Sequence, residues 1–158
     1  MSTRPDLVAC WLFRLDAVGR PEILLLHRAP GRMYAGLWQC VTGRLEPSER
    51  IVDAALREVA EETGLGAADL EAFYETDLVN WFHEASLDAI LGEAVFAAQV
   101  RPEALVALSS EHDDARWVDV QEATKLVTWP AYERAIETVV WLIENPAKGT
   151  AFRLPGPV

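Results

Sequence analysis

The 158-residue sequence has only two cysteines, Cys10 and Cys40, and no Cys-x-x-Cys pair. Two cysteines cannot form a disulfide framework, so packing must stabilise the fold. No apolar run approaches the roughly 18 residues that cross a membrane, and the first residues lack the apolar stretch of a signal peptide. We therefore expect a reduced, cytoplasmic protein with no membrane partner.

Positive charge is also scarce in this sequence. Fourteen Lys and Arg residues stand against 25 Asp and Glu residues, which gives a formal net charge of −11. Such a surface repels nucleic acid and anionic membranes at long range, so we expect no nucleic-acid partner. An anionic ligand would need a bound cation between itself and the protein.

The remaining composition is typical of a folded domain. Apolar residues make up 51% of the chain and charged residues 25%. This length suits one domain with a core of its own. We expect a single domain over residues 1–147 and a flexible C-terminal tail over residues 148–158, which contains two prolines and two glycines.

Hydrophobic patterning predicts strands and helices mixed along the chain. Apolar runs at 7–15 and 22–27 indicate strands that are buried on both faces. Further strands are expected at 37–41, 70–79, 94–100 and 115–120, and helices at 48–64, 121–127 and 130–144. In the first helix, Ser48 is the expected N-cap and Gly64 the expected C-terminal residue. The mixed order favours an α/β fold in which helices sandwich a mixed sheet.

Three glutamates in the first helix carry the clearest chemical signal. Glu58, Glu61 and Glu62 stand at i, i+3 and i+4, so they project from one face of a helix. Their charges repel, the helix has no lysine, and the only nearby base is Arg57. A hard divalent cation relieves such repulsion, and Mg²⁺ prefers oxygen ligands, water and phosphate. A solvated acidic face is the alternative that these glutamates alone leave open.

A glycine precedes this helix. Gly43 would let the backbone turn tightly or approach a ligand closely. A backbone carbonyl here, that of Thr42 or Gly43, is a further candidate metal ligand.

The segment from Gly43 to Leu65 resembles the sequence box of the Nudix hydrolase family at every fixed position. The box reads Gly, five residues, Glu, seven residues, Arg-Glu, an aliphatic residue, any residue, Glu-Glu, any residue, Gly and an aliphatic residue. The matching residues are Gly43, Glu49, Arg57, Glu58, Val59, Glu61, Glu62, Gly64 and Leu65. The resemblance implies a Nudix-type α/β/α sandwich and hydrolysis of a nucleoside diphosphate derivative with Mg²⁺ or Mn²⁺.

The same resemblance implies roles for the residues of the box. Glu58 and Glu62 would be metal ligands, and Glu61 would be a further ligand or would position the water. Glu49 and Arg57 would pair to hold the loop against the helix. A carboxylate would accept a proton as the general base.

Two segments outside the box resemble one branch of the family, the dihydroneopterin triphosphate pyrophosphatases. They are Leu37-Trp-Gln-Cys-Val-Thr-Gly43 and the stretch from Ser110 to Trp129. This resemblance implies that a nucleoside or pterin triphosphate is split into pyrophosphate and a monophosphate. The alternatives are another Nudix substrate (ADP-ribose, a dinucleoside polyphosphate or an oxidised nucleotide) and a nucleotide sensor without turnover.

Flanking residues supply candidates for substrate binding. Arg28 and Arg44 suit phosphate groups because guanidinium matches phosphate geometry, although surface ion pairs would explain them as well. Trp38 offers a stacking surface and Gln39 an amide for a base edge, with core packing as the alternative for Trp38. Glu111, in a polar loop before a strand, is a candidate metal ligand or base. We expect a small-molecule partner and a monomer or homodimer.

Overall fold

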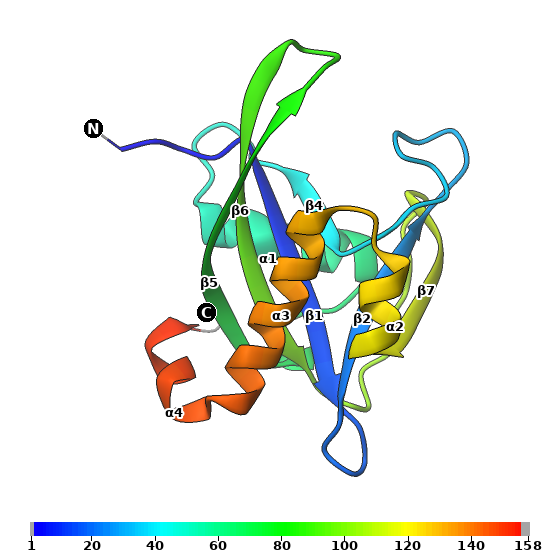
Figure 1. Ribbon diagram of the computed structural model, residues 1–158, viewed down its shortest axis with the longest axis vertical. Coiled ribbons are helices and arrows are strands. Elements are labelled where there is room, and N and C mark those ends of the chain that lie inside the picture. The colour runs from blue at the N-terminus through cyan, green and yellow to red at the C-terminus, as the bar shows by residue number, and fades with distance from the viewer. Residues whose placement is uncertain (1, 156–158) are drawn as a thin grey trace.

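The computed structural model describes residues 2–155, and its centre is one mixed sheet (Figure 1). The strands are β1 Leu7–Leu15, β2 Pro21–Arg28, β3 Trp38–Gln39, β4 Val41–Arg44, β5 Leu70–Glu84, β6 Ala89–Val100, β7 His112–Asp119 and β8 Arg153–Leu154. The helices are α1 Ile51–Thr63, α2 Val120–Leu126, α3 Pro130–Glu144 and α4 Pro146–Gly149. Single 3₁₀ turns follow α1 and α4. No helix in this described range is long and apolar enough to cross a membrane.

The sheet joins the two halves of the chain through its central strands. Its order is β3-β2-β1-β6-β5-β8, with β4 also paired to β1 and β7 to β2. The β1 and β6 strands are parallel, whereas the neighbouring pairs are antiparallel. This arrangement confirms the mixed sheet expected from the order of elements.

Helices cover both faces of the sheet, as the apolar runs predicted. On β1, Val8, Cys10 and Leu12 pack with α1, while Ala9, Trp11 and Phe13 pack with α3. Successive residues of a strand point to opposite faces, so an unbroken apolar run is what a sheet buried on both sides requires. Figure 1 shows α2 and α3 in front of the sheet and α1 behind it, which is an α/β/α sandwich.

The expected start of α1 is wrong. Its N-cap position is Arg50 rather than Ser48, and no side chain caps the helix. The side chain of Glu49 accepts a hydrogen bond from the Glu46 amide and pairs with Arg57, so the chain before Ile51 follows that contact instead of a helical turn. The expected end is confirmed, because Gly64 has a left-handed backbone (φ 71°) and its amide donates to the Ala60 carbonyl.

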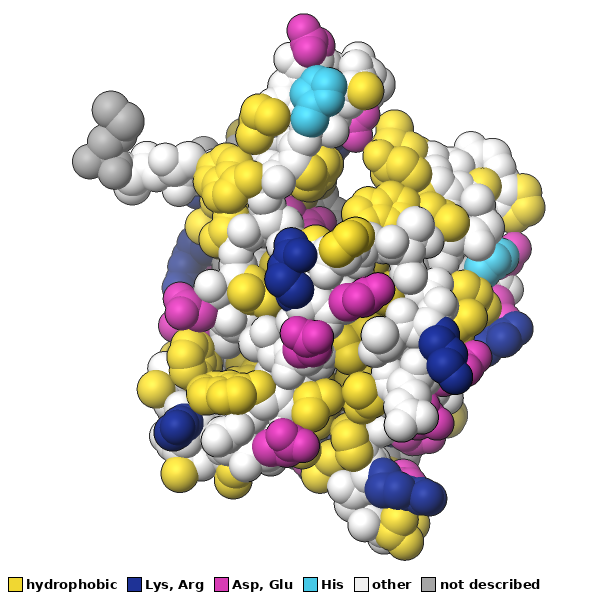
Figure 2. Space-filling view, viewed as in Figure 1, with side chains coloured by type: hydrophobic (Ala, Val, Ile, Leu, Met, Phe, Trp, Pro, Cys, Tyr) yellow, Lys and Arg dark blue, Asp and Glu magenta, His cyan; other side chains and the backbone are white. Residues whose placement is uncertain are grey.

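Two other boundaries differ from expectation. The strand expected at 37–41 is divided at Cys40 into β3 and β4, and Gly43 lies inside β4 opposite Val8. The β5 and β6 strands are longer than predicted and form a hairpin that projects from the sheet (Figure 1). Side chains near its tip, such as Trp81 and Ile90, are exposed, and Figure 2 shows hydrophobic side chains on the surface of this hairpin. No burial pattern in the sequence therefore marked this part.

The segment expected to be a flexible tail is structured through Leu154. The β8 strand pairs with β5, with Leu154 opposite Phe73, and Phe152 packs edge-on against Trp141. The tail prediction for residues 156–158 lies outside the described residues, and the assignment of residues 1–147 to one domain stays a prediction.

Candidate active site

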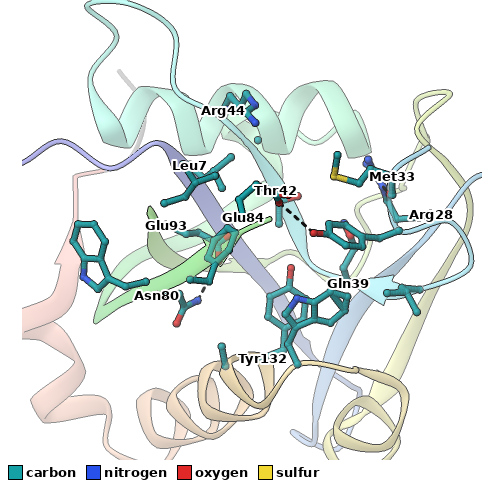
Figure 3. A pocket seen from close by; sticks show the side chains of 18 of the residues that line it. Leu7, Arg28, Met33, Gln39, Thr42, Arg44, Asn80, Glu84, Glu93 and Tyr132 are labelled. Atoms are coloured by element: carbon teal, nitrogen blue, oxygen red, sulfur yellow. Dashed lines mark hydrogen bonds between the residues drawn. The ribbon is translucent and has the colours of Figure 1, made fainter. Parts of the chain in front are cut away.

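A pocket of about 550 Å³ opens at one end of the sheet (Figure 3). It is bordered by the loop after β2, by β3 and β4, by the outer parts of β5 and β6, and by the start of α3. Several residues singled out in the sequence line it, among them Arg28, Trp38, Gln39, Thr42, Gly43, Arg44 and Glu111. Segments from both halves of the chain therefore converge on one cavity.

The three glutamates of α1 lie in different environments. Glu62 is 2% exposed and Glu58 is half-buried, whereas 58% of the Glu61 side chain is exposed. The three glutamates were expected to share one face of the helix. In the structure Glu58 and Glu62 point toward the sheet, whereas Glu61 points toward solvent. The guanidinium of Arg57 contacts both Glu58 (2.6 Å) and Glu61 (3.2 Å), which relieves part of their repulsion.

Gly43 allows the side chain of Glu58 to lie directly against β4. A Cβ atom at residue 43 would come within 1.9 Å of the Glu58 Cδ and 2.1 Å of its Oε1. No side chain fits in that space. Gly43 thus permits a close approach, as expected, but the approaching group is Glu58 and the backbone is an extended strand rather than a turn.

Burial and mutual repulsion strongly favour the protonated form of Glu62. Neither of its carboxylate oxygens has a hydrogen-bond partner among the described residues. Burial raises the pKa of Glu62 to about 9, and the negative charges of Glu111 and Glu58 add to the rise. The Thr42 backbone and Arg28 favour the ionised form, although the Thr42 amide does not reach hydrogen-bond geometry. Burial also raises the pKa of Glu58, against the opposing effect of Arg57.

These carboxylates fit a divalent cation. Within residues 2–155 no three acidic, histidine or cysteine side chains are already arranged to hold a metal. However, Glu58, Glu62 and Glu111 interact electrostatically, and Glu62 has no competing partner. Carboxylate oxygens are the ligands that Mg²⁺ prefers, and the oxygens of Glu62 have no other partner among the described residues.

Glu49 and Arg57 come together as the family resemblance suggested. Arg57 Nε lies 2.8 Å from Glu49 Oε1, and its Nη2 lies 3.0 Å from Oε2, so the pair is bidentate. The same Nη2 donates to the Arg44 carbonyl on β4. This geometry ties the loop before α1 to both the helix and the sheet, and it lowers the pKa of Glu49 to about 2.

The acidic loop before β7 reaches the pocket through an ion pair. Arg28 Nη1 lies 3.1 Å from Glu111 Oε2, and Arg28 Nε donates to the Met33 carbonyl. The ion pair thus ties Arg28, at the end of β2, to the loop that carries Glu111. The two residues are 83 positions apart in the sequence. The Arg44 side chain, by contrast, forms no ion pair with any described residue, although it lines the pocket.

The apolar part of the pocket contains aromatic residues besides Trp38. Tyr34 packs edge-on against Trp129 at 5.3 Å, and Trp129 stacks on Tyr132 at 5.9 Å. Trp38 is in contact with His27 and with the guanidinium of Arg116, so one part of its ring is already covered. Trp129 and Tyr132 stand three positions apart at the start of α3, whereas Tyr34 lies in the loop after β2, so no local spacing links Tyr34 to the other two.

One of the acidic residues that line the pocket, Glu93, was not predicted. Glu93 on β6 is 6% exposed and accepts a hydrogen bond of 3.0 Å from Asn80 on β5. The available signal was a glutamate inside the apolar run of β6. Gln39, which was expected to bind a base edge, is buried and points toward the same pocket (Figure 3).

The fold and the site define a class of protein in which a helix bearing several glutamates lies against a mixed sheet beside a ligand-sized pocket. The NUDIX domain family matches residues 4–142, and the chain therefore belongs to this family.

Similar proteins cover several activities. The chain is 36% identical over 116 residues to an octanoyltransferase of Myxococcus xanthus, but it spans less than a third (31%) of that protein. It is 34% identical over 110 residues to the asymmetrical bis(5'-nucleosyl)-tetraphosphatase of Sus scrofa, covering 66% of this chain and 69% of that one.

Solved structures share the fold. A NUDIX hydrolase of Listeria monocytogenes superposes with a TM-score of 0.77 at 26% identity, over 90% of this chain and 97% of that one. The E. coli dihydroneopterin triphosphate pyrophosphohydrolase superposes with a TM-score of 0.72 at 24% identity, over 89% and 98%. The branch of the family that the sequence favoured is thus one of several structural neighbours.

Proposed function

We propose that the protein is a metal-dependent pyrophosphohydrolase that splits a nucleoside or pterin triphosphate into pyrophosphate and a monophosphate. One observation carries this proposal: Glu62 interacts electrostatically with Glu58 and Glu111, and Glu111 lines a pocket whose other walls include aromatic and hydrogen-bonding side chains. Glu58 and Glu62 are not among the lining residues, and Glu58 lies directly against Gly43, which is one of them. The charged end suits a cation and phosphates, and the flat end suits a heterocycle.

The carboxylates would hold the cation. We assign Glu58 and Glu62 as ligands of Mg²⁺, with Mn²⁺ as a possible substitute, and the backbone carbonyl of Gly43 as a further ligand. When bound, the cation neutralises charge on the phosphoryl oxygens and lowers the pKa of water. Glu61 stays a proposed further ligand, although its side chain is exposed and points away from Glu62.

The remaining charged residues position substrate and accept a proton. Arg44 has an uncommitted guanidinium at the pocket, and we assign it to a phosphate group together with Arg28. Glu111 lies at the pocket with 42% of its side chain exposed. Water can therefore reach it, and we assign Glu111 as the general base or an additional ligand. Trp38 and Gln39 are assigned to the heterocycle.

A second candidate is hydrolysis of a dinucleoside polyphosphate. It is favoured by the Sus scrofa relative, whose name describes cleavage of a bis(5'-nucleosyl) tetraphosphate. Both candidates use the same carboxylates, so the choice between them depends on the substrate. We propose a cytoplasmic protein with a small-molecule partner, acting as a monomer or homodimer.

A substrate panel with Mg²⁺ tests the proposal. Nucleoside triphosphates, a pterin triphosphate, ADP-ribose and a dinucleoside tetraphosphate are scored for pyrophosphate and orthophosphate release. Pyrophosphate with a monophosphate supports the first function, and preferred cleavage of the dinucleoside compound supports the second. Glu62→Gln should abolish turnover, and the matched control Glu75→Gln, at an exposed site on β5, should not. Saturable binding without any product would identify a sensor and refute both.

A further inference from the structure

Glu93 and Asn80 form an acid–amide pair in the wall of the pocket. They stand opposite each other on β6 and β5, and Asn80 Nδ2 donates to Glu93 Oε1 at 3.0 Å. Figure 3 shows both side chains on the same side of the cavity, away from Arg28 and Met33. Neither residue belongs to the family box, and neither interacts with the carboxylates of α1 by hydrogen bond.

The residues packed around Glu93 do not compensate for the burial of its carboxyl group. Its neighbours along β6 are apolar, and its partner on β1 is Leu7. No lysine or arginine in the described chain pairs with it, and Asn80 supplies its one hydrogen bond. Burying a carboxylate with a single neutral partner costs free energy. The second oxygen has no partner in the described chain and lies at the wall of an open pocket, so a donor group of a ligand can bind it.

Flat aromatic side chains border the same cavity. Tyr34, Trp129 and Tyr132 line it, with Trp129 stacked on Tyr132. Aromatic walls select a planar ring, and a hydrogen-bonding pair in the wall can then read the edge of that ring.

We propose that Glu93 and Asn80 recognise a heterocycle whose edge presents a ring N–H beside an exocyclic amino group, as in guanine or a 2-amino-4-oxopteridine. This inference rests on the proposed function and narrows its substrate class. Burial raises the pKa of Glu93, and its ionised form only accepts hydrogen bonds. The free Oε2 and the second lone pair of Oε1, which already accepts from Asn80, match two adjacent donors. Adenine presents a ring nitrogen acceptor in place of one donor, which would face the carboxylate lone pairs.

Binding of non-hydrolysable α,β-methylene triphosphates measures this preference without turnover. The guanosine and inosine analogues differ only in the 2-amino group, so their Kd ratio from calorimetry isolates one hydrogen bond. We expect the guanosine analogue to bind roughly 10- to 100-fold more tightly than the inosine analogue, since a hydrogen bond to a charged group is involved. The adenosine analogue should bind at least about tenfold more weakly than the guanosine analogue.

Substitution of the acid tests the assignment to Glu93. Glu93→Gln keeps the shape but replaces one acceptor oxygen with a donor, so the guanosine-to-inosine ratio should fall below about 3 and the relative affinity for the adenosine analogue should rise. Glu75→Gln, on the exposed side of β5, is the matched control and should retain the wild-type ratio. Thermal unfolding of both variants establishes that they are folded.

The outcomes separate this inference from the proposed function. Guanosine selectivity that Glu93→Gln removes supports the inference, even if no triphosphate is hydrolysed. Hydrolysis of triphosphates with equal affinity for the guanosine and inosine analogues overturns the inference and leaves the enzyme assignment standing. Selectivity that survives in Glu93→Gln, or no binding of any analogue, also overturns the inference.

Discussion

Replacing Glu62 by glutamine should stabilise the metal-free protein while it abolishes activity. Glu62 is buried with both oxygens unpaired, and its pKa is raised to about 9 from the ordinary value of 4.5. Between these two pH values the folded protein keeps a proton that the unfolded chain releases. The contribution of protonated Glu62 to the free energy of unfolding is therefore fully present below pH 4.5 and is lost as pH rises toward 9.

The size of the effect follows from the pKa shift. One pKa unit corresponds to about 1.4 kcal/mol, and pH 7 lies about 2.5 units above the ordinary value, so the cost at pH 7 is about 3 kcal/mol. Glutamine has a similar shape but cannot ionise. Glu62→Gln should therefore be more stable than the wild type by about 3 kcal/mol at pH 7 and by almost nothing at pH 4.5.

Urea unfolding in the presence of a chelator, from pH 4.5 to 8.5, measures this difference. The stability gap between Glu62→Gln and the wild type should widen by about 1.4 kcal/mol per pH unit. Glu61→Gln is the control, since that side chain is largely exposed and its change should stay within about 0.5 kcal/mol at every pH. Parallel pH profiles for the wild type and Glu62→Gln would refute the argument that burial protonates Glu62.

Three further outcomes are expected. Gly43→Ala should lower kcat/KM by at least about tenfold, because the added Cβ would lie 1.9 Å from Glu58 Cδ and must displace that carboxylate; unchanged kinetics would contradict the close approach. Arg57→Ala should lower the Tm measured by scanning calorimetry. This decrease in Tm should become smaller as pH falls from 4.5 toward 2, because Glu49 then takes up a proton and the ion pair is lost in the wild type as well. A decrease in Tm that does not depend on pH would exclude the ion pair as its cause. Mg²⁺ at 100 times its Kd should stabilise the wild type by about 2.7 kcal/mol and leave Glu62→Gln unchanged, so equal Tm increases would place the cation elsewhere.

Local features of the site could be predicted from the sequence because they depend on the spacing of residues along one helix or strand. The positions of Glu58 and Glu62 on a helix follow from its period, and the end of α1 follows from the left-handed backbone that Gly64 adopts. The apolar runs of β1 and β2 indicated burial on both faces, and helices do cover both faces of the sheet. The family box covers these local positions, which is why the sequence alone identified the class.

The sequence could not determine which of the three glutamates is buried. Helical period places them on one side, but the rotation of α1 against β4 decides that Glu62 loses solvent while Glu61 keeps it. Likewise, Ser48 has the composition of an N-cap, but the contact between Glu49 and Arg57 sets the start of the helix instead.

The sequence by itself determined the acidic helix and the glycine at its C-terminal end, the strands that are buried on both faces, and the family. Tertiary structure alone decided that Arg28 meets Glu111 and that Glu93 meets Asn80 in one pocket. The physical reason is that helix period and strand alternation act between near neighbours in the chain. The register of a sheet and the docking of a loop instead join residues far apart, and they depend on how the whole core packs.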